Sequence, residues 1–355
     1  MNRKIILSFI IGTAISLATL YLAFRNVPFQ DLVNYLSSIQ LFWIVPSVLL
    51  VIVGFTLRAV RWRYILAGTQ KVAFWSAFHP LMIGFMVNCV LPGRVGELTR
   101  PLVLNRREGL PMSTGLATVV VERIFDMLIL LALFLFISLT IDFDRQSSMQ
   151  FAGYQVDFQT LEKVFNGMLQ LGALLLLAIA MVSFRKSRRI VNNIVLALPG
   201  ILFFAGEDFR DKIHRKVCRP VVGIIDNVAE GMAMVKNPKR VAACFSFSLA
   251  IWFIHAVSYY VFAIGCPDID ITLLEMTMVM IIICFVIALP SVPGYWGLWE
   301  AGGVFAMSLF GVPPREAAGF TLANHAIQIL PVILVGMISA WISGINIVQV
   351  SYQEG

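Results

Sequence analysis

Nine charged side chains interrupt an otherwise apolar stretch between Asn88 and Asp126. Guanidinium groups bind phosphate in a bidentate way, and carboxylates can position them or carry a proton. A charge at membrane depth costs about 2.5–3.5 kcal/mol to insert, so it should face a partner or a polar cavity. These residue types therefore predict a polar cleft for an anionic group. The nine are Arg94, Glu97, Arg100, Arg106, Arg107, Glu108, Glu122, Arg123 and Asp126.

The first of these side chains follow one another at helical spacing. Arg94, Glu97 and Arg100 are three residues apart, so a helix that begins near Val95 places them along one face. We expect Arg94 and Arg100 to hold a phosphate group. Glu97 would position the arginines or carry a coupling proton.

A second group opens the apolar span that runs on from Met127 to Thr140. Glu122 and Asp126 are four residues apart and share a face, and Arg123 can pair with Asp126. In the functional interpretation Arg123 joins the phosphate site, while Glu122, Asp126 and the distant Glu300 position the arginines or carry the proton. The alternative is a buried network of ion pairs that only fixes this segment to its neighbours.

His325 is the histidine whose position attracts most interest, because it follows Asn324 within the last apolar span. A histidine in a membrane helix commonly forms a hydrogen bond between helices. Packing and ligand contact are equally compatible with His325. The chain has no HExxH motif and no CxxC pair among its five cysteines, so we expect no metal and no cofactor.

Composition places these groups in a membrane. Of the 355 residues 59% are hydrophobic and 13% charged, and the mean hydropathy is +0.85. We therefore expect one polytopic membrane domain over residues 1–355, without a soluble catalytic domain. The net charge of +7 resides mainly in loops, as membrane topology requires, so it does not indicate nucleic acid.

Apolar runs of about 20 residues, the length that crosses a bilayer, recur along the chain. Two shorter runs, 72–91 and 273–289, each end in a Pro-Gly element. We expect six full spans, at 5–24, 41–57, 115–140, 164–184, 241–264 and 317–345.

The distribution of lysine and arginine predicts the orientation. Basic residues near the N-terminus and in 185–240 mark the cytoplasmic side, whereas the loops 142–163 and 265–272 are acidic or lack basic residues. Both termini are therefore expected in the cytoplasm. A further cytoplasmic loop is assigned to the basic residues Arg58, Arg61, Arg63 and Lys71.

This orientation leaves the runs 72–91 and 273–289 unable to cross completely. We expect two re-entrant hairpins, at 72–112 and 273–313, which enter from opposite faces and whose irregular backbone is shielded from lipid. The fold class is then all-α, with about eight membrane helices. Apolar residues at helical spacing within 185–240 predict a helix in the cytoplasmic interface or, equally, one packed on the membrane domain.

The two hairpins resemble each other in sequence. Glu97 to Glu122 and Glu300 to His325 are each 25 residues apart. An inverted repeat with broken helices is typical of secondary transporters. The structural breaks are expected at Pro92, Gly93 and Gly96 and at Pro293, Gly294 and Gly297.

The motifs PGRVGELTR, ERIFD and PGYWGLWE resemble the transmembrane region of the lysylphosphatidylglycerol synthase/flippase family, from Arg58 to about Gly344. The resemblance implies a lipid-translocating domain of eight helices in a bacterial or archaeal inner membrane. The family often has an arginine at or beside the position of His325. The functional positions that the resemblance carries over are Asn88, Pro92, Gly93, Arg94, Gly96, Glu97, Arg100, Glu122, Arg123, Asp126, Pro293, Gly294, Gly297 and Glu300.

The sequence thus predicts a flippase or scramblase of the plasma membrane that moves an anionic, phosphate-bearing lipid and is not an enzyme. Its expected partners are membrane lipids, and a homodimer is left open. The alternatives are a small-solute transporter of the same architecture, an intramembrane enzyme that uses Glu97, Glu122 and His325, and a scaffold without transport.

Overall fold

The long apolar blocks of the sequence form long helices. The computed structural model describes residues 13–14, 16–21, 23–25, 27–91, 94–141, 149–151, 154–156, 184–201, 207–231, 237–288 and 293–345, with single positions between 163 and 182. Only about half of the positions in the expected spans 5–24 and 164–184 are described, and the expected break at Pro92 and Gly93 lies outside the described residues.

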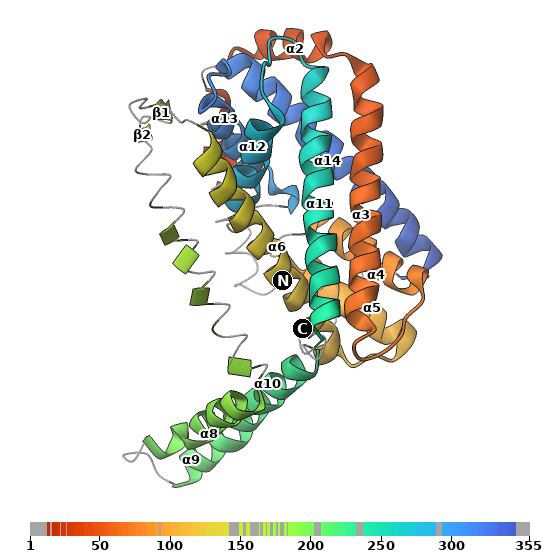
Figure 1. Ribbon diagram of the computed structural model, residues 1–355, viewed down its shortest axis with the longest axis vertical. Coiled ribbons are helices and arrows are strands. Elements are labelled where there is room, and N and C mark those ends of the chain that lie inside the picture. The colour runs from red at the N-terminus through yellow and green to blue at the C-terminus, as the bar shows by residue number, and fades with distance from the viewer. Residues whose placement is uncertain are drawn as a thin grey trace.

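Three described helices are long and apolar enough to cross a membrane: Leu41–Leu66, Pro238–Ile264 and Pro314–Ile342. The first comprises η1 (Leu41–Trp43) and α3 (Ile44–Leu66), and the others are α11 (Pro238–Ile264) and α14 (Pro314–Ile342). α3 and α11 run side by side (Figure 1). Their contact is close because small residues form it: the Ser258 hydroxyl donates to the Ser47 carbonyl oxygen at 3.0 Å.

α6 (Met112–Thr140) corresponds to the expected span 115–140 and carries Glu122, Arg123 and Asp126. Near one end of the long helices lies the short helix α2 (Phe29–Ser38), whose Tyr35 is buried against α14. The largest apolar core joins α2, α6, α11 and α14 with α12 and α13. One short antiparallel hairpin, β1 (Met149–Phe151) and β2 (Tyr154–Val156), departs from the all-helical expectation.

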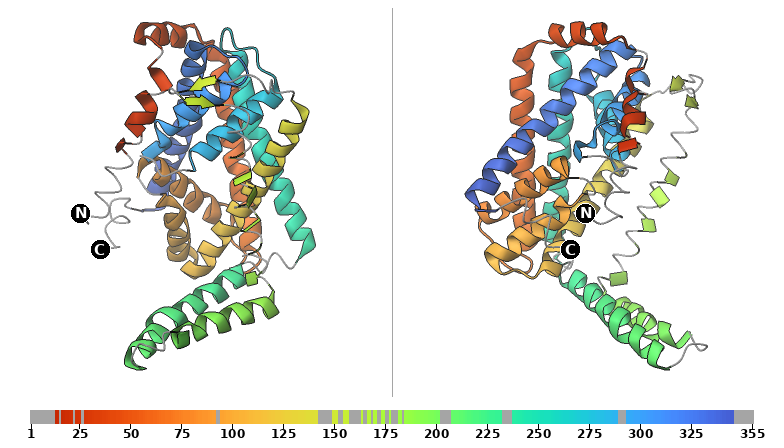
Figure 2. Two further views of the ribbon diagram at one scale, coloured as in Figure 1. Left: turned by 90° about the vertical axis from the view of Figure 1, so that its left-hand side faces the viewer. Right: turned by 180° about the vertical axis from the view of Figure 1, so that it is seen from behind.

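The two expected hairpins are pairs of short helices. The first is α4 (Phe74–Val90) with α5 (Gly96–Glu108), and the second is α12 (Leu273–Val286), η4 (Pro293–Tyr295) and α13 (Leu298–Ser308). Figures 1 and 2 show the two pairs toward opposite ends of the long helices. The turning back of each pair within a membrane, the count of eight membrane helices and the inverted repeat stay predictions.

The first pair depends on a close crossing of two backbones. Gly84 of α4 and Gly96 of α5 touch, and a Cβ atom on Gly96 would collide with the Gly84 carbonyl oxygen. The Asn88 side chain accepts a hydrogen bond from the Gly96 backbone N–H at 2.8 Å. Asn88 therefore satisfies one of the free donors at the start of α5.

The tips of the two pairs meet. Nη2 of Arg94 donates to the Ile287 carbonyl oxygen at 2.8 Å. A Cβ atom on Gly294 would lie 3.2 Å from the Cys89 carbonyl oxygen. The backbone turns sharply here, with positive φ at Arg94 (55°), Gly294 (72°) and Tyr295 (62°). Non-glycine residues rarely adopt this conformation, so surrounding contacts must hold it.

The basic segment forms a helical arm: α8 (Arg185–Ile201), α9 (Glu207–Ile213), the π-helix η2 (His214–Cys218) and α10 (Arg219–Gly231). The arm projects from the end of the molecule opposite α2 (Figure 1). Arg188 Nε lies 3.2 Å from Asp226, which ties α8 to α10. α10 packs against α6, and Ile190 and Ile194 on α8 are exposed. The expected helix is present, while its contact with lipid stays a prediction.

Candidate functional site

Two arginines that the sequence placed in a loop lie inside the molecule. Arg58 and Arg61 belong to α3, which continues to Leu66 instead of ending at residue 57. Arg58 is 6% exposed and Arg61 is 0% exposed. The expected loop position of Arg58, Arg61 and Arg63 is therefore wrong, whereas Lys71 does lie between α3 and α4, and the cytoplasmic side of that loop stays a prediction. Buried arginines need anionic partners, and α6 supplies them.

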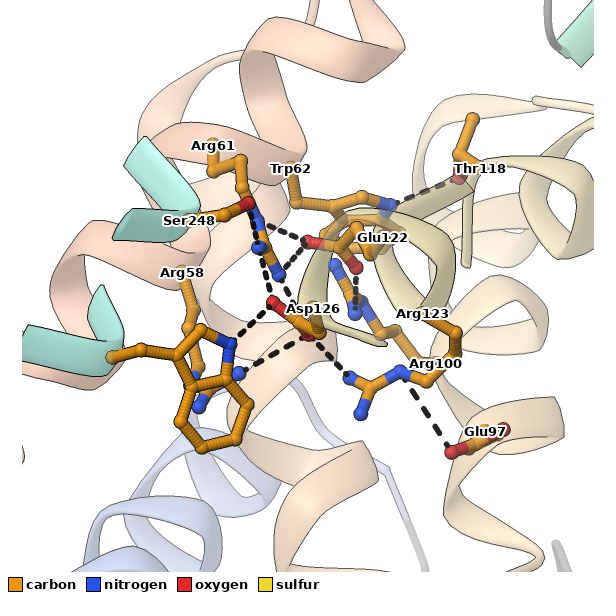
Figure 3. A network of polar contacts seen from close by, with 11 residues as sticks. Arg58, Arg61, Trp62, Glu97, Arg100, Thr118, Glu122, Arg123, Asp126 and Ser248 are labelled. Atoms are coloured by element: carbon orange, nitrogen blue, oxygen red, sulfur yellow. Dashed lines mark hydrogen bonds and ion pairs between the residues drawn. The ribbon is translucent and has the colours of Figure 1, made fainter. Parts of the chain in front are cut away.

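Four arginines, Arg58, Arg61, Arg100 and Arg123, gather around the carboxylates of α6 and are called the arginine cluster. Arg61 lies at its centre. Its Nη1 lies 2.5 Å from Asp126 Oδ1 and 2.6 Å from the Ser248 hydroxyl, and its Nη2 donates to Asp126 Oδ2 at 3.1 Å. The pairing with Asp126 is bidentate, the strongest geometry for an arginine and a carboxylate. Arg61 also contacts Glu122 Oε1 at 3.5 Å, so it bridges the two carboxylates of α6 (Figure 3).

Arg100 of α5 completes the pairing of Glu122. Its Nη1 lies 2.5 Å from Glu122 Oε2. The guanidinium group stacks over the Trp62 ring, 3.6 Å from the ring centroid. Trp62 is itself fixed, because its indole N–H donates to Thr118 at 2.9 Å. A tryptophan ring favours a cation on its face.

Side chains of α3 and α11 also contact the Asp126 carboxylate. Arg58 Nη1 lies 3.5 Å from Asp126 Oδ2, and the Trp252 indole N–H donates to Asp126 Oδ1 at 3.2 Å. The Arg58 guanidinium lies 5.0 Å from the Trp252 ring centroid and 5.7 Å from that of Phe55. Three helices thus converge on one carboxylate.

Arg123 and Glu97 form the open edge of the arginine cluster (Figure 3). Their side chains are 39% and 34% exposed. Arg123 Nε lies 4.0 Å from Glu97, and its Nη2 lies 3.8 Å from Asp126. Both distances are at the outer limit of ion-pair contact, so Arg123 is held loosely.

The arginine cluster carries an excess of positive charge. Four guanidinium groups, of Arg58, Arg61, Arg100 and Arg123, face the three carboxylates of Glu97, Glu122 and Asp126, which leaves a net charge of 4 − 3 = +1. Among the described residues, no hydrogen-bond acceptor meets Nε of Arg58, Nε and Nη2 of Arg100 or Nε of Arg123. An anion could use such donors.

Glu300 of the second hairpin and His325 of α14 form a separate buried pair. Both side chains are 0% exposed. His325 Nδ1 lies 2.5 Å from Glu300 Oε1, and Nε2 lies 2.8 Å from the Gly294 carbonyl oxygen. The Gly297 backbone N–H donates to Glu300 Oε2 at 2.7 Å. Trp296 and Trp299 flank the imidazole, with Trp299 stacked at 4.6 Å and 2°.

The structure thus gathers some of the expected site residues and separates others. It brings together Glu97, Arg100, Glu122, Arg123 and Asp126, adds Arg58 and Arg61, and places Arg94 at the tip. Asn88 bonds within the first hairpin, whereas Glu300 and His325 contact each other between α13 and α14. In the described part of the chain, no group of three His, Cys, Asp or Glu side chains is placed to hold a metal ion.

An apolar groove lies beside the arginine cluster, between α3, α4 and α14. Phe55 is both part of its wall and a neighbour of Arg58. Phe55 therefore contacts both the groove and the arginine cluster. The lining residues are Val51, Ile52, Phe55, Phe78, Met82, Pro331, Val332 and Val335.

Comparison with known proteins gives one family and several distant relatives. The family model for the lysylphosphatidylglycerol synthase TM region matches residues 9–336. The chain is 26% identical to the glycosyltransferase AglD of Haloferax volcanii over 89% of this chain, but it spans only 50% of that protein's length. It is 22% identical to a UPF0104 membrane protein of Methanocaldococcus jannaschii, over 82% of each chain. The identity to a UPF0104 membrane protein of Methanothermobacter thermautotrophicus is 25%, over 96% of this chain and 93% of the relative. No solved structure gives a significant match.

Proposed function

The chain belongs to the lysylphosphatidylglycerol synthase transmembrane-region family, and on that premise we propose that it moves an anionic, phosphate-bearing lipid between the two leaflets of a membrane. We place it in the plasma membrane as a multi-pass protein with both termini in the cytoplasm. The proposal concerns the membrane domain, and it assigns the lipid headgroup to the arginine cluster.

The position of Arg123 carries the proposal. This arginine lies at the exposed edge of a cluster whose other guanidinium groups are buried and whose net charge is positive. Its ion pairs of 3.8 and 4.0 Å are long enough for a phosphate to replace them. A phosphate offers two oxygens to one guanidinium, a stronger contact than either long pair.

The buried arginines supply a fixed background charge for this contact. Arg58, Arg61 and Arg100 are held by Glu122 and Asp126 and need not move when an anion approaches. Such prearranged charges act strongly in a region of low dielectric constant. They favour an anionic headgroup over a zwitterionic one.

The two hairpin tips border the same region. Arg94 is exposed at the first tip, and the Tyr295 hydroxyl at the second lies within electrostatic range of Arg94, Glu97 and Arg123. A headgroup bound at Arg123 would therefore face both tips. The apolar groove that Phe55 helps to line offers a surface for a hydrocarbon tail, since its lining is apolar.

A leaflet-exchange assay tests the proposal. Labelled phosphatidylglycerol or phosphatidylcholine is placed in proteoliposomes, and its transfer between leaflets is followed with a membrane-impermeant quencher. Arg123→Gln should slow exchange of the anionic lipid by about tenfold or more, because a hydrogen bond to a charged group contributes about 1.5–3 kcal/mol. Arg63→Gln removes an exposed arginine of α3 outside the cluster and is the matched control.

Two results would contradict the proposal. One is exchange in wild-type proteoliposomes no faster than in vesicles without protein. The other is an equal rate for Arg123→Gln and Arg63→Gln.

An enzyme is the second candidate, because one relative is named as a glycosyltransferase. The match covers half of that relative, so its activity can reside in the half that this chain does not match. Mass spectrometry of lipids recovered from the same proteoliposomes, supplied with sugar donors, separates the candidates. A modified lipid formed by wild type and lost in Glu122→Gln would favour the enzyme.

A further inference from the structure

The Glu300–His325 pair is a buried titratable site that the proposed headgroup contact does not use. It lies between α13 and α14, at the base of the second hairpin's tip. Each of its polar atoms has a hydrogen-bond partner within the protein. Its geometry therefore fixes how many hydrogens it holds.

The count of hydrogens follows from the acceptors. The Gly294 carbonyl oxygen can only accept, so Nε2 of His325 must carry a hydrogen. The 2.5 Å contact between Nδ1 and Glu300 Oε1 needs a second hydrogen between the two atoms. The pair therefore holds one proton more than a carboxylate beside a neutral imidazole. This count is the same whether the shared proton resides on nitrogen or oxygen.

Charge gives this extra proton its importance. With the proton the pair is neutral as a whole, and without it one negative charge remains at a site that is 0% exposed. Burying such a charge without a partner is costly. Of the titratable groups that face this region from neighbouring elements, Tyr259 on α11, Cys284 on α12 and Tyr295 on η4 carry no positive charge. The guanidinium group of Arg94, at the first tip, bonds the Ile287 carbonyl oxygen.

We propose that Glu300 and His325 form a proton-binding site whose proton holds the tip of the second hairpin against the first. Release of the proton to water leaves the imidazole with one hydrogen, although it faces two acceptors, the Glu300 carboxylate and the Gly294 carbonyl oxygen. If that hydrogen remains on Nδ1, the bond to Gly294 is lost. If it remains on Nε2, the bare Nδ1 faces the Glu300 carboxylate.

Either outcome loosens the turn at which the tips touch. Gly294 packs against the Cys89 carbonyl, and Tyr295 follows it in a strained conformation. Proton release would therefore free the second tip and open the region beside Arg123. The proton site stands on its own geometry, while its coupling to lipid movement rests on the proposed function.

Tryptophan fluorescence tests the site without any transport assay. Trp296 and Trp299 lie 4.4 and 4.6 Å from the imidazole, so a change of its charge or of the turn alters their emission. The full-length protein in detergent is titrated with acid and base. Wild type should show a reversible pH-dependent change that is lost in both His325→Gln and Glu300→Gln. His79→Gln is the matched control, because His79 is also buried and stacks on a tryptophan, Trp75.

The outcomes separate the site from its coupling. An identical titration in wild type and in correctly folded His325→Gln and Glu300→Gln, as judged by gel filtration, overturns the proton site. If both variants lose the pH-dependent change in fluorescence, as expected, the coupling to lipid movement is tested next. Leaflet exchange is then measured with and without a pH gradient. The rate should depend on the gradient in wild type but not in Glu300→Gln, and gradient-independent exchange in wild type overturns the coupling. Absence of exchange under every condition contradicts the proposed function and leaves the fluorescence result standing.

Discussion

Arg61 fixes the arginine cluster at the scale of single residues. It is fully buried and bonds Asp126, Ser248 and Glu122, which come from two other helices. Its removal would leave two carboxylates in the interior with Arg58 and Arg100 as their remaining close partners. The stability of the protein should therefore depend on Arg61 more than on any exposed arginine.

Arg61→Met is expected to destabilise the protein by about 3–5 kcal/mol, because breaking a buried ion pair strands the partner's charge. The measurement is thermal unfolding in detergent, followed by tryptophan fluorescence. Arg63→Met on the exposed side of the same helix should change stability little. Equal unfolding temperatures for the two variants would contradict a structural role for the cluster.

Part of the arginine cluster can be predicted from the sequence. Glu122, Arg123 and Asp126 were recognised because charges inside an apolar helix require a partner. Arg58 and Arg61 were missed because basic residues at the end of an apolar run were attributed to a cytoplasmic loop. The useful signal was the absence of a turn-forming residue between Arg58 and Leu66, which lets the helix continue and carry both arginines inward.

The close crossing of α4 and α5 determines how the first hairpin presents its charges. Gly84 and Gly96 bring the two backbones into contact, and Asn88 bonds the Gly96 N–H. This crossing fixes where α5 begins, and with it the positions of Glu97 and Arg100. A wider crossing would move Arg100 away from Glu122.

Gly96→Ala should therefore lower the unfolding temperature, because the new methyl group meets backbone atoms of α4 that cannot rotate away. Overpacking of this kind costs about 1–3 kcal/mol or more. Gly200→Ala on α8 is the contrasting variant: no atom lies within 4 Å of its added Cβ. Alanine favours a helix by about 0.8–1 kcal/mol over glycine, so this variant should be neutral or stabilising. The same sign for both variants would contradict the close crossing.

At this scale the sequence predicted the helices better than their contacts. The runs 72–91 and 273–289 anticipate α4 and α12 to within a few residues, because the Pro-Gly elements interrupt the helices. The contact between the tips could not be predicted. It depends on Arg94 reaching Ile287, 193 residues away, and on the positive φ at Tyr295, a residue type with no preference for that conformation.

The whole molecule has two distinct ends. α2 lies at one end with the second hairpin, and the basic α8–α10 arm projects from the other end, on the side of the first hairpin (Figures 1 and 2). The excess of basic residues on the arm predicts that its end faces the cytoplasm. The helix expected within 185–240 was accessible from its apolar spacing, whereas the π-helix at His214–Cys218 and the contact of α10 with α6 were not, because both depend on packing.

Thiol labelling tests this orientation. In a variant without the five native cysteines, Gln30→Cys on α2 should react with a membrane-impermeant reagent in intact cells. Lys186→Cys on α8 should react only after the membrane is permeabilised. Labelling of both positions under the same condition, or in the reverse order, would show that the predicted orientation is wrong.

The long sequence separations within the arginine cluster affect how the protein is made. Arg61 is synthesised 65 residues before Asp126 and 187 residues before Ser248. At translation rates of about 5–20 residues per second, about 3–13 s pass between the synthesis of Arg61 and that of its carboxylate partner Asp126. Arg58 and Arg61 lie in the C-terminal part of α3, where long side chains can extend to the headgroups in the meantime. Insertion of α3 into the membrane and its packing against α6 are therefore separate events, because α6 must be synthesised before the two helices can pack.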